Sequence, residues 1–138
     1  IAIDYTDTRR DKKYVIYYRG LSKEDVSEYN SGIGILSNAV RNMGGEDYAQ
    51  MYLSYLMPNS GYEDIATKHS ISSDNSPFIS VTKDMATAIQ FSKQTGLFAT
   101  ISTNRKVFFN PFNVFGENEY LVPIVILFPE IISVSPAY

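Results

Sequence analysis

Residues 115–128 read FGENEYLVPIVILF. Two glutamates, Glu117 and Glu119, stand one residue apart, and an apolar run of strand length follows them. Side chains at positions i and i+2 of a strand point to the same face. Two carboxylates on one face repel each other and resist burial together. This face is therefore either a solvated edge or a functional site.

Five further stretches predict strands, because β-branched and aromatic residues dominate them. YVIYYRG at 14–20 ends at a glycine, and SPFISVT at 76–82 precedes a helical pattern. LFATIS at 97–102 and KVFF at 106–109 are either two strands or the halves of one bent strand. EIISVSP at 130–136 completes a β-rich C-terminal half.

Helical patterns occupy mostly the first half of the chain. Ser22, followed by acidic residues, opens a short helix that closes near Gly32. A weaker helical stretch at 35–45 ends in two glycines, a firmer one spans 46–61, and a fourth runs from 83 to Gly96. Helices followed by strands predict an α+β fold rather than alternating βαβ units. The 138 residues suit a single domain.

Composition narrows the possible functions. The net charge of −3 gives no electrostatic reason to expect non-specific binding of nucleic acid. The longest apolar run, at 121–128, is far shorter than the roughly 20 residues of a spanning helix, so we expect no membrane insertion. The absence of cysteine excludes disulfides and thiolate chemistry. The lone His69 lies in a polar stretch without a metal-ligand pattern, and we expect no metal site.

Polar residues recur near the ends of the predicted strands. Arg19 and Gly20 end the first strand, where an arginine can pair with phosphate and a glycine permits close approach to the backbone. Ser80 and Thr82 alternate, so their hydroxyls share one face of a strand. Taken singly, each of these features is ordinary in a surface residue, a strand end or a helix cap.

Taken together, in this order and strand context, they resemble the mono-ADP-ribosyltransferase family. Arg-Gly, Ser-x-Thr and Glu-x-Glu are similar to the motifs of its arginine-serine-glutamate class, which includes the enzymatic chain of cholera toxin and the clostridial binary toxins. The resemblance covers roughly residues 14–134. The stretches SPFISVTKDMATAIQFS and GENEYLVPI look like C-terminal effector domains of bacterial polymorphic and insecticidal-complex toxins. The resemblance implies a split β-sandwich with flanking helices, NAD in a central cleft, and a domain excised from a longer toxin.

The resemblance also implies roles for the residues of the NAD site. Glu119 would stabilise positive charge on the ribose, and Ser80 would orient Glu119. Arg19 would bind an NAD phosphate, and Gly20 would lie where backbone groups hold the nicotinamide amide. Thr82 would support the site. The motif often carries threonine where this chain has Val81, but that position points to the opposite face, toward the core.

Four further positions concern the nicotinamide and the acceptor. Phe91 is a candidate for stacking on nicotinamide, with helix core as the alternative. Phe112 and Phe115 would be the exposed aromatic residues of the loop that recognises the acceptor, unless they pack inward. Glu117 would engage the acceptor as a general base. In the family, Glu-x-Glu accompanies arginine modification.

The implied function is a secreted or delivered effector that transfers ADP-ribose from NAD to a target macromolecule in the cytoplasm of another cell. A protein target is favoured, RNA is an alternative, and a cognate immunity protein is a possible partner. Two other functions stay open: an NAD glycohydrolase on the same fold, and a binding module without activity. A labelled macromolecule after incubation with NAD would identify the transferase, and free ADP-ribose alone would identify the glycohydrolase. Failure to bind NAD would favour the module without activity.

Overall fold

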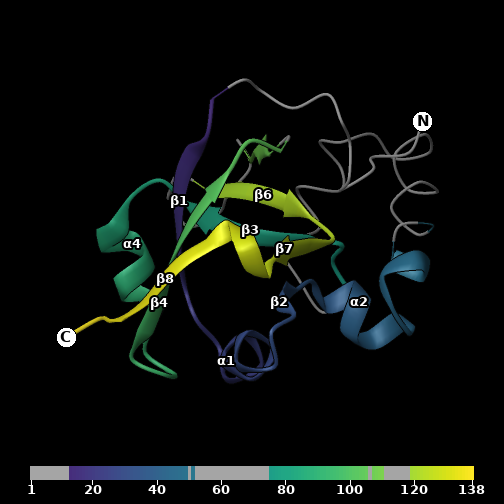
Figure 1. The fold of residues 1–138 in the computed structure, drawn as a ribbon, viewed down its shortest axis with the longest axis horizontal. Coiled ribbons are helices and arrows are strands. Elements are labelled where there is room, and N and C mark those ends of the chain that lie inside the picture. Colours follow the sequence, from purple (N-terminus) through teal and green to yellow (C-terminus); the bar gives the residue numbers. More distant parts are fainter. Residues whose placement is uncertain (1–12, 50, 52–74, 106, 111–118) are drawn as a thin grey trace.

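Antiparallel strands in two sheets form the centre of the structure (Figure 1). The computed structural model describes residues 13–49, 51, 75–105, 107–110 and 119–138. Within them, a six-stranded sheet has the order β5-β6-β3-β1-β4-β8, and β2 pairs with β7 in a second sheet. The elements are β1 Val15–Gly20, α1 Lys23–Asn30, β2 Gly34–Leu36, α2 Asn38–Met43, β3 Phe78–Thr82, α4 Met85–Gln90, β4 Leu97–Thr103, β5 Phe108–Phe109, β6 Glu119–Pro123, β7 Val125–Leu127, a 3-10 turn Phe128–Glu130, and β8 Ile131–Pro136.

Helices thus flank a mostly antiparallel sheet, which agrees with the α+β class expected from the sequence. The strands expected at 14–20 and 76–82 are confirmed as β1 and β3. The expected first helix is α1: Ser22 caps it, and Asp25 returns a side-chain contact to the backbone of Ser22. None of the helices in the described ranges is long and apolar enough to cross a membrane.

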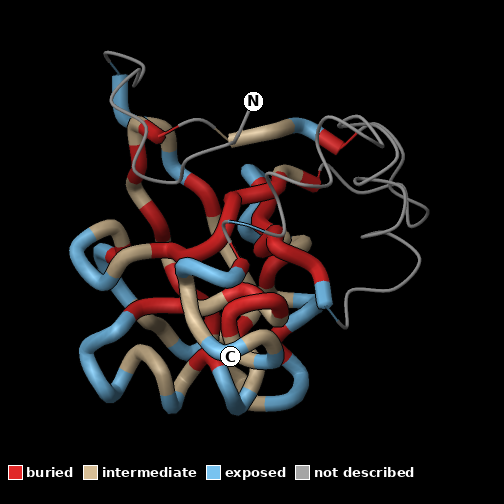
Figure 2. The backbone as a smooth tube through the Cα atoms, turned by 90° about the vertical axis from the view of Figure 1, so that its right-hand side faces the viewer, coloured by how far each residue is buried: buried red, intermediate tan, exposed pale blue. Residues whose placement is uncertain are grey.

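Buried residues gather in the interior of the molecule (Figure 2). The main core joins one face of the large sheet to the β2–β7 pair, through Tyr17, Ile79, Val81, Ala99, Ile101, Val122, Ile35 and Ile126. A second cluster packs α2 against β3, β6 and β7, through Ala39, Val40, Phe78, Leu121, Ile124 and Val125. Val81 belongs to the main core, as its place between Ser80 and Thr82 predicts.

Two stretches differ from the sequence-based expectation. The helix expected at 35–45 is confirmed only over Asn38–Met43, because residues 34–36 form β2 against β7. A side chain at Gly34 would lie 2.0 Å from the Ile126 carbonyl oxygen, so only glycine permits this close pairing. The apolar run at 121–128 also divides: Ile124, at φ 70°, separates β6 from β7, which lie in different sheets.

Residues 97–109 form two separate strands rather than the halves of one bent strand. β4 lies beside β1 and β8, whereas β5 lies at the far edge of the sheet beside β6. The helix expected at 83–96 is shorter than the pattern suggested, since α4 ends at Gln90 and turns lead on to Gly96.

The large sheet opens between β1 and β3. β1 pairs with β4 along its whole length, from Val15 to Gly20, and β3 pairs with β6 along its whole length. Between β1 and β3 the register contains one pair, Tyr18 with Thr82. The pairing between the two strands therefore stops next to Arg19 on β1 and Ser80 on β3. Backbone groups at this point are left to form hydrogen bonds with side chains.

Candidate active site

Arg19, Ser80 and Glu119 lie on three adjacent strands, β1, β3 and β6. The Arg19 Nη1 group donates to the Ser80 carbonyl oxygen at 2.8 Å, across the opening between β1 and β3. The Ser80 hydroxyl donates to Glu119 Oε2 at 2.5 Å. Residues 61 and 39 positions apart in the sequence are thus joined in one hydrogen-bonded series.

The Glu119 carboxylate is held from two sides. It is only 8% exposed, and its second oxygen, Oε1, accepts a hydrogen bond of 2.6 Å from Asn110 Nδ2. The Asn110 backbone N–H also donates to the Glu119 carbonyl oxygen at 2.9 Å, which places Asn110 opposite Glu119 across the β5–β6 edge. Donors on both oxygens fix the orientation of the carboxylate, so its negative charge has one position in the site.

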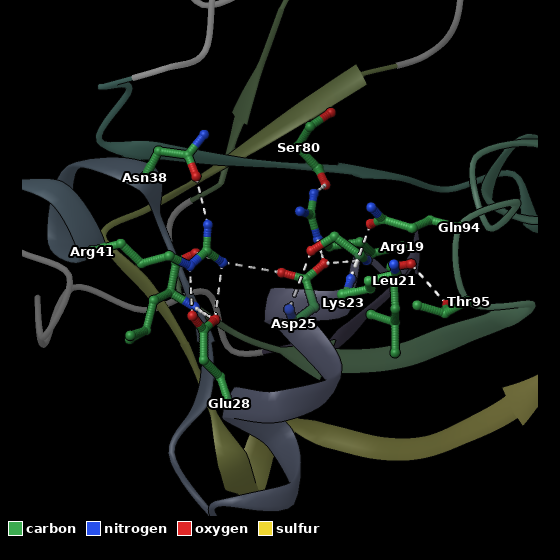
Figure 3. Close-up of polar contacts among 12 residues, drawn as sticks. Arg19, Leu21, Lys23, Asp25, Glu28, Asn38, Arg41, Ser80, Gln94 and Thr95 are labelled. Atoms are coloured by element: carbon green, nitrogen blue, oxygen red, sulfur yellow. Dashed lines mark hydrogen bonds and ion pairs between the residues drawn. The ribbon is translucent and has the colours of Figure 1, made fainter.

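Unlike the Glu119 carboxylate, the Arg19 guanidinium is only partly occupied by hydrogen bonds. Its Nε donates to Asp25 Oδ2 at 3.0 Å, and its Nη1 donates to Ser80, as Figure 3 shows. Its Nη2 forms no hydrogen bond within the described ranges, and the side chain is 22% exposed. A guanidinium with unused donors and access to solvent can bind an anionic oxygen.

A network of charged side chains runs from Arg19 through Asp25 to Arg41 and Glu28 (Figure 3). Asp25, which is fully buried, also contacts Arg41 Nη2 through Oδ1 at 3.3 Å. Arg41 in turn makes a two-pronged contact with Glu28, at 2.5 and 2.9 Å, and donates to the side chain of Asn38 and the carbonyl of Leu36. The hydrogen bonds that Arg41 donates to Glu28 outweigh the effect of burial and raise the pKa of Arg41. The network links α1 and α2 to the site arginine.

Gly20 has a structural reason to be glycine. A side chain there would lie 2.4 Å from the Ala88 carbonyl oxygen and 2.5 Å from the Phe91 backbone carbon. The close approach that the sequence suggested is made by the last turn of α4, and this packing accounts for the glycine without any ligand. A role for the Gly20 backbone in holding nicotinamide stays a prediction.

Thr82 and Phe91 lie at the two ends of the α4 segment. The Thr82 hydroxyl oxygen is buried and accepts from the Asp84 backbone N–H, so it supports the turn that starts α4. Phe91 follows the last residue of α4 and is 56% exposed, so the helix-core alternative is wrong for its ring. Its ring makes no aromatic contact within the described part of the chain, and stacking on nicotinamide stays a prediction.

Three of the predicted positions, Glu117, Phe112 and Phe115, lie outside the described residues, as does His69. The shared face of the two glutamates and the acceptor loop therefore stay predictions. Among the residues that the structure describes, no group of three or more His, Cys, Asp or Glu side chains could hold a metal ion.

Two members of the site were not predicted from the sequence. Asn110 was assigned to an Asn-Pro loop, and Asp25 to the acidic first turn of a helix. A signal existed for Asp25, because the capping pattern Ser-x-x-Asp places a carboxylate at the start of α1, six residues from Arg19. Nothing local indicated Asn110.

Comparison with known proteins gives no independent indication of function. No protein-family model matches the chain. No curated protein matches it either.

Proposed function

We propose that this chain is an NAD-dependent mono-ADP-ribosyltransferase that favours an arginine acceptor on a protein. The observation that supports the proposal is the hydrogen-bonded series from Arg19 through Ser80 to Glu119, on three adjacent strands. The motif order alone does not require these three residues to touch. Their contact, beside the opening between β1 and β3, is what a shared site needs.

The charges of the cluster suit NAD. One end offers unused guanidinium donors on Arg19, which fit a phosphate oxygen. The other end offers the buried carboxylate of Glu119, which suits the positively charged nicotinamide ring that is bonded to the ribose. A pair of opposite charges held by separate strands matches a ligand that is anionic at its phosphates and cationic at its nicotinamide.

Each residue has a distinct part in the proposed reaction. NAD supplies ADP-ribose, and the bond between nicotinamide and ribose breaks as the acceptor attacks. Glu119 stabilises the positive charge that develops on the sugar, as a carboxylate does in glycoside hydrolysis. Ser80 and Asn110 keep that carboxylate in place, and Arg19 binds phosphate. Glu117 accepts the proton that the acceptor loses.

The proposal extends to the fold and its setting. The two sheets would be the halves of a split β-sandwich, with NAD in the cleft between them. The domain would act as a bacterial toxin or effector, delivered into the cytoplasm of a target cell. Its acceptor would be a macromolecule of that cell, and an immunity protein would protect the producer.

The test uses NAD labelled in its adenine moiety, a cell lysate and the protein. A transferase releases nicotinamide and labels macromolecules, which mass spectrometry then identifies together with the acceptor residue. Release of nicotinamide with free ADP-ribose only would identify a glycohydrolase instead. No release of nicotinamide and no binding of NAD would leave a binding module without activity and would contradict the proposal.

A variant at Glu117 separates transfer from hydrolysis. Glu117→Gln should lose transfer to arginine by about 100-fold or more, because a guanidinium needs a base to become nucleophilic. Slow hydrolysis should largely persist, since water attacks a stabilised sugar cation with less help. Nicotinamide release and acceptor labelling are followed in one reaction. An equal fall in both would show that Glu117 instead helps to bind NAD or to hold Glu119.

A further inference from the structure

Asp25 is a buried acid that the proposed chemistry leaves unused. Its Oδ2 accepts from Arg19 Nε at 3.0 Å and from the Ser22 backbone N–H at 3.0 Å. Its Oδ1 contacts Arg41 Nη2 at 3.3 Å. The side chain is fully buried. A helix cap alone does not require this, because a capping carboxylate works equally well in solvent.

The contacts around Arg19 define the plane of its guanidinium. Asp25 fixes the Nε edge, and the Ser80 carbonyl fixes Nη1. Two contacts at different nitrogens of a planar group leave it little freedom to rotate. The nitrogen that remains without a hydrogen bond in the described part of the chain is Nη2.

We infer that Asp25 is a positioning residue for the NAD phosphate: it holds the Arg19 guanidinium so that Nη2 is kept for the ligand. The inference rests on the proposed function. Asp25 touches Arg19 but none of the groups around Glu119 in the contacts described, so its effect falls on the binding of NAD. The turnover of bound NAD should change little.

A role in charge alone predicts the opposite sign. Arg19 and Arg41 carry two positive charges, and Asp25 and Glu28 carry two negative ones. If Asp25 only neutralised Arg19, its removal would leave the site more positive and NAD would bind more tightly, most of all at low salt. If Asp25 orients Arg19, its removal weakens binding. The direction of the change in affinity therefore decides between the two roles.

Glu28 provides a matched control. Like Asp25, it lies on α1, carries one negative charge and contacts Arg41. It makes no contact with Arg19 in the network described, and its carboxylate also accepts a hydrogen bond from the Leu36 backbone N–H. Glu28→Gln thus removes the same charge from the same network without touching the phosphate-binding residue.

The experiment measures the dissociation constant of NAD by calorimetry for wild type, Asp25→Asn and Glu28→Gln, with circular dichroism as the check of folding. Asparagine keeps an oxygen in the place of Oδ2, where it can accept from both Ser22 N–H and Arg19 Nε, so α1 retains its cap while the contact with Arg19 loses its negative charge. We expect Asp25→Asn to weaken binding by about tenfold, because a neutral oxygen holds the Arg19 guanidinium less firmly than a carboxylate does. Glu28→Gln should bind as wild type does. In steady-state assays Asp25→Asn should raise KM and leave kcat nearly unchanged.

The outcomes separate this inference from the proposed function. If wild type does not bind NAD, both fail. If wild type binds and Asp25→Asn binds equally or more tightly, the positioning role alone is overturned. An equal loss in Glu28→Gln also overturns it, because the effect would then be general loosening. If Asp25→Asn does not fold, Asp25→Glu decides: it keeps the charge and moves the carboxylate, so a tenfold loss supports positioning and wild-type affinity contradicts it.

Discussion

Arg19 and Arg105 each pair with a carboxylate and a backbone carbonyl, yet they use their donors differently. Arg105 binds Glu130 with two prongs, Nε to Oε2 at 2.8 Å and Nη2 to Oε1 at 2.6 Å, and also donates to the Val125 carbonyl. Its side chain is 3% exposed. Arg19 contacts its carboxylate through one nitrogen and remains 22% exposed.

The difference separates a structural arginine from one suited to a ligand. Arg105 ties the end of β4 to β7 and to the turn before β8, and Glu130 also accepts from the Thr103 hydroxyl and the Leu127 N–H. A two-pronged pair that is this deeply buried gives a ligand in solvent little access to its guanidinium. Arg19 lies where the sheet opens and contacts Ser80, which in turn contacts Glu119. The Nη2 donors of Arg19 are not used in the contacts described.

The largest expected effect is on stability, at Arg105. Arg105→Met leaves Glu130 without its positively charged partner, and breaking a buried pair costs about 3–5 kcal/mol. The free energy of unfolding, measured in urea, should fall by that amount, while the affinity of the folded protein for NAD is unchanged. The double variant Arg105→Met/Glu130→Met should recover much of the loss. A fall in NAD affinity with stability intact would erase the distinction between the two arginines.

The next effect is on catalysis, at Ser80. Ser80→Ala removes the hydroxyl that holds Glu119 Oε2, and a hydrogen bond to a charged group is worth about 1.5–3 kcal/mol. The kcat for nicotinamide release should fall about 10- to 100-fold, with little change in the affinity for NAD. The control is Ser102→Ala, a half-buried serine on β4, which β3 and β1 separate from β6. Equal rates in the two variants would show that Ser80 does not orient the carboxylate.

A smaller effect sharpens the comparison of the arginines directly. Arg19→Lys should weaken NAD binding by about tenfold, because an ammonium group cannot reproduce a planar donor array. Arg105→Lys should leave the affinity unchanged and lower only the melting temperature. Calorimetry and thermal unfolding on the two variants measure both quantities. The comparison fails if the two exchange these phenotypes.

The smallest effect is the pH dependence at Glu130. Burial by itself would raise the pKa of this carboxyl, but the hydrogen bonds and charge of Arg105, with help from Thr103 and Leu127, lower the pKa below its ordinary value. The unfolded chain therefore binds more protons near and below pH 4, so stability from this group is complete above about pH 4.3 and declines as pH falls through the folded pKa. The slope should not exceed about 1.4 kcal/mol per pH unit. Glu130→Gln should lose that slope.

Local patterns were enough to predict the strands that carry the site. β-branched runs predicted β1 and β3, alternation predicted that Ser80 and Thr82 share a face, and Ser22 predicted the start of α1. These predictions depend on near neighbours in the sequence, and so they hold.

The rest depends on which elements lie side by side. Asn110 reaches Glu119 only because β5 pairs with β6 at the sheet edge. β2 is three residues long and exists because β7 lies against it. The break at Ile124 is stabilised by hydrogen bonds to Pro77 and from Ser37, which are far away in the sequence. Such contacts leave no periodic trace in the chain.

The central claim is that Glu119 carries out the chemistry on NAD, and Glu119→Gln tests it most directly. Glutamine can accept from Asn110 and donate to the Ser80 hydroxyl oxygen, so the fold and the affinity for NAD should persist. Nicotinamide release, measured at saturating NAD, should fall about 100- to 1,000-fold, because the negative charge that we propose stabilises the sugar cation is lost. Release at the wild-type rate by the folded variant would contradict the account.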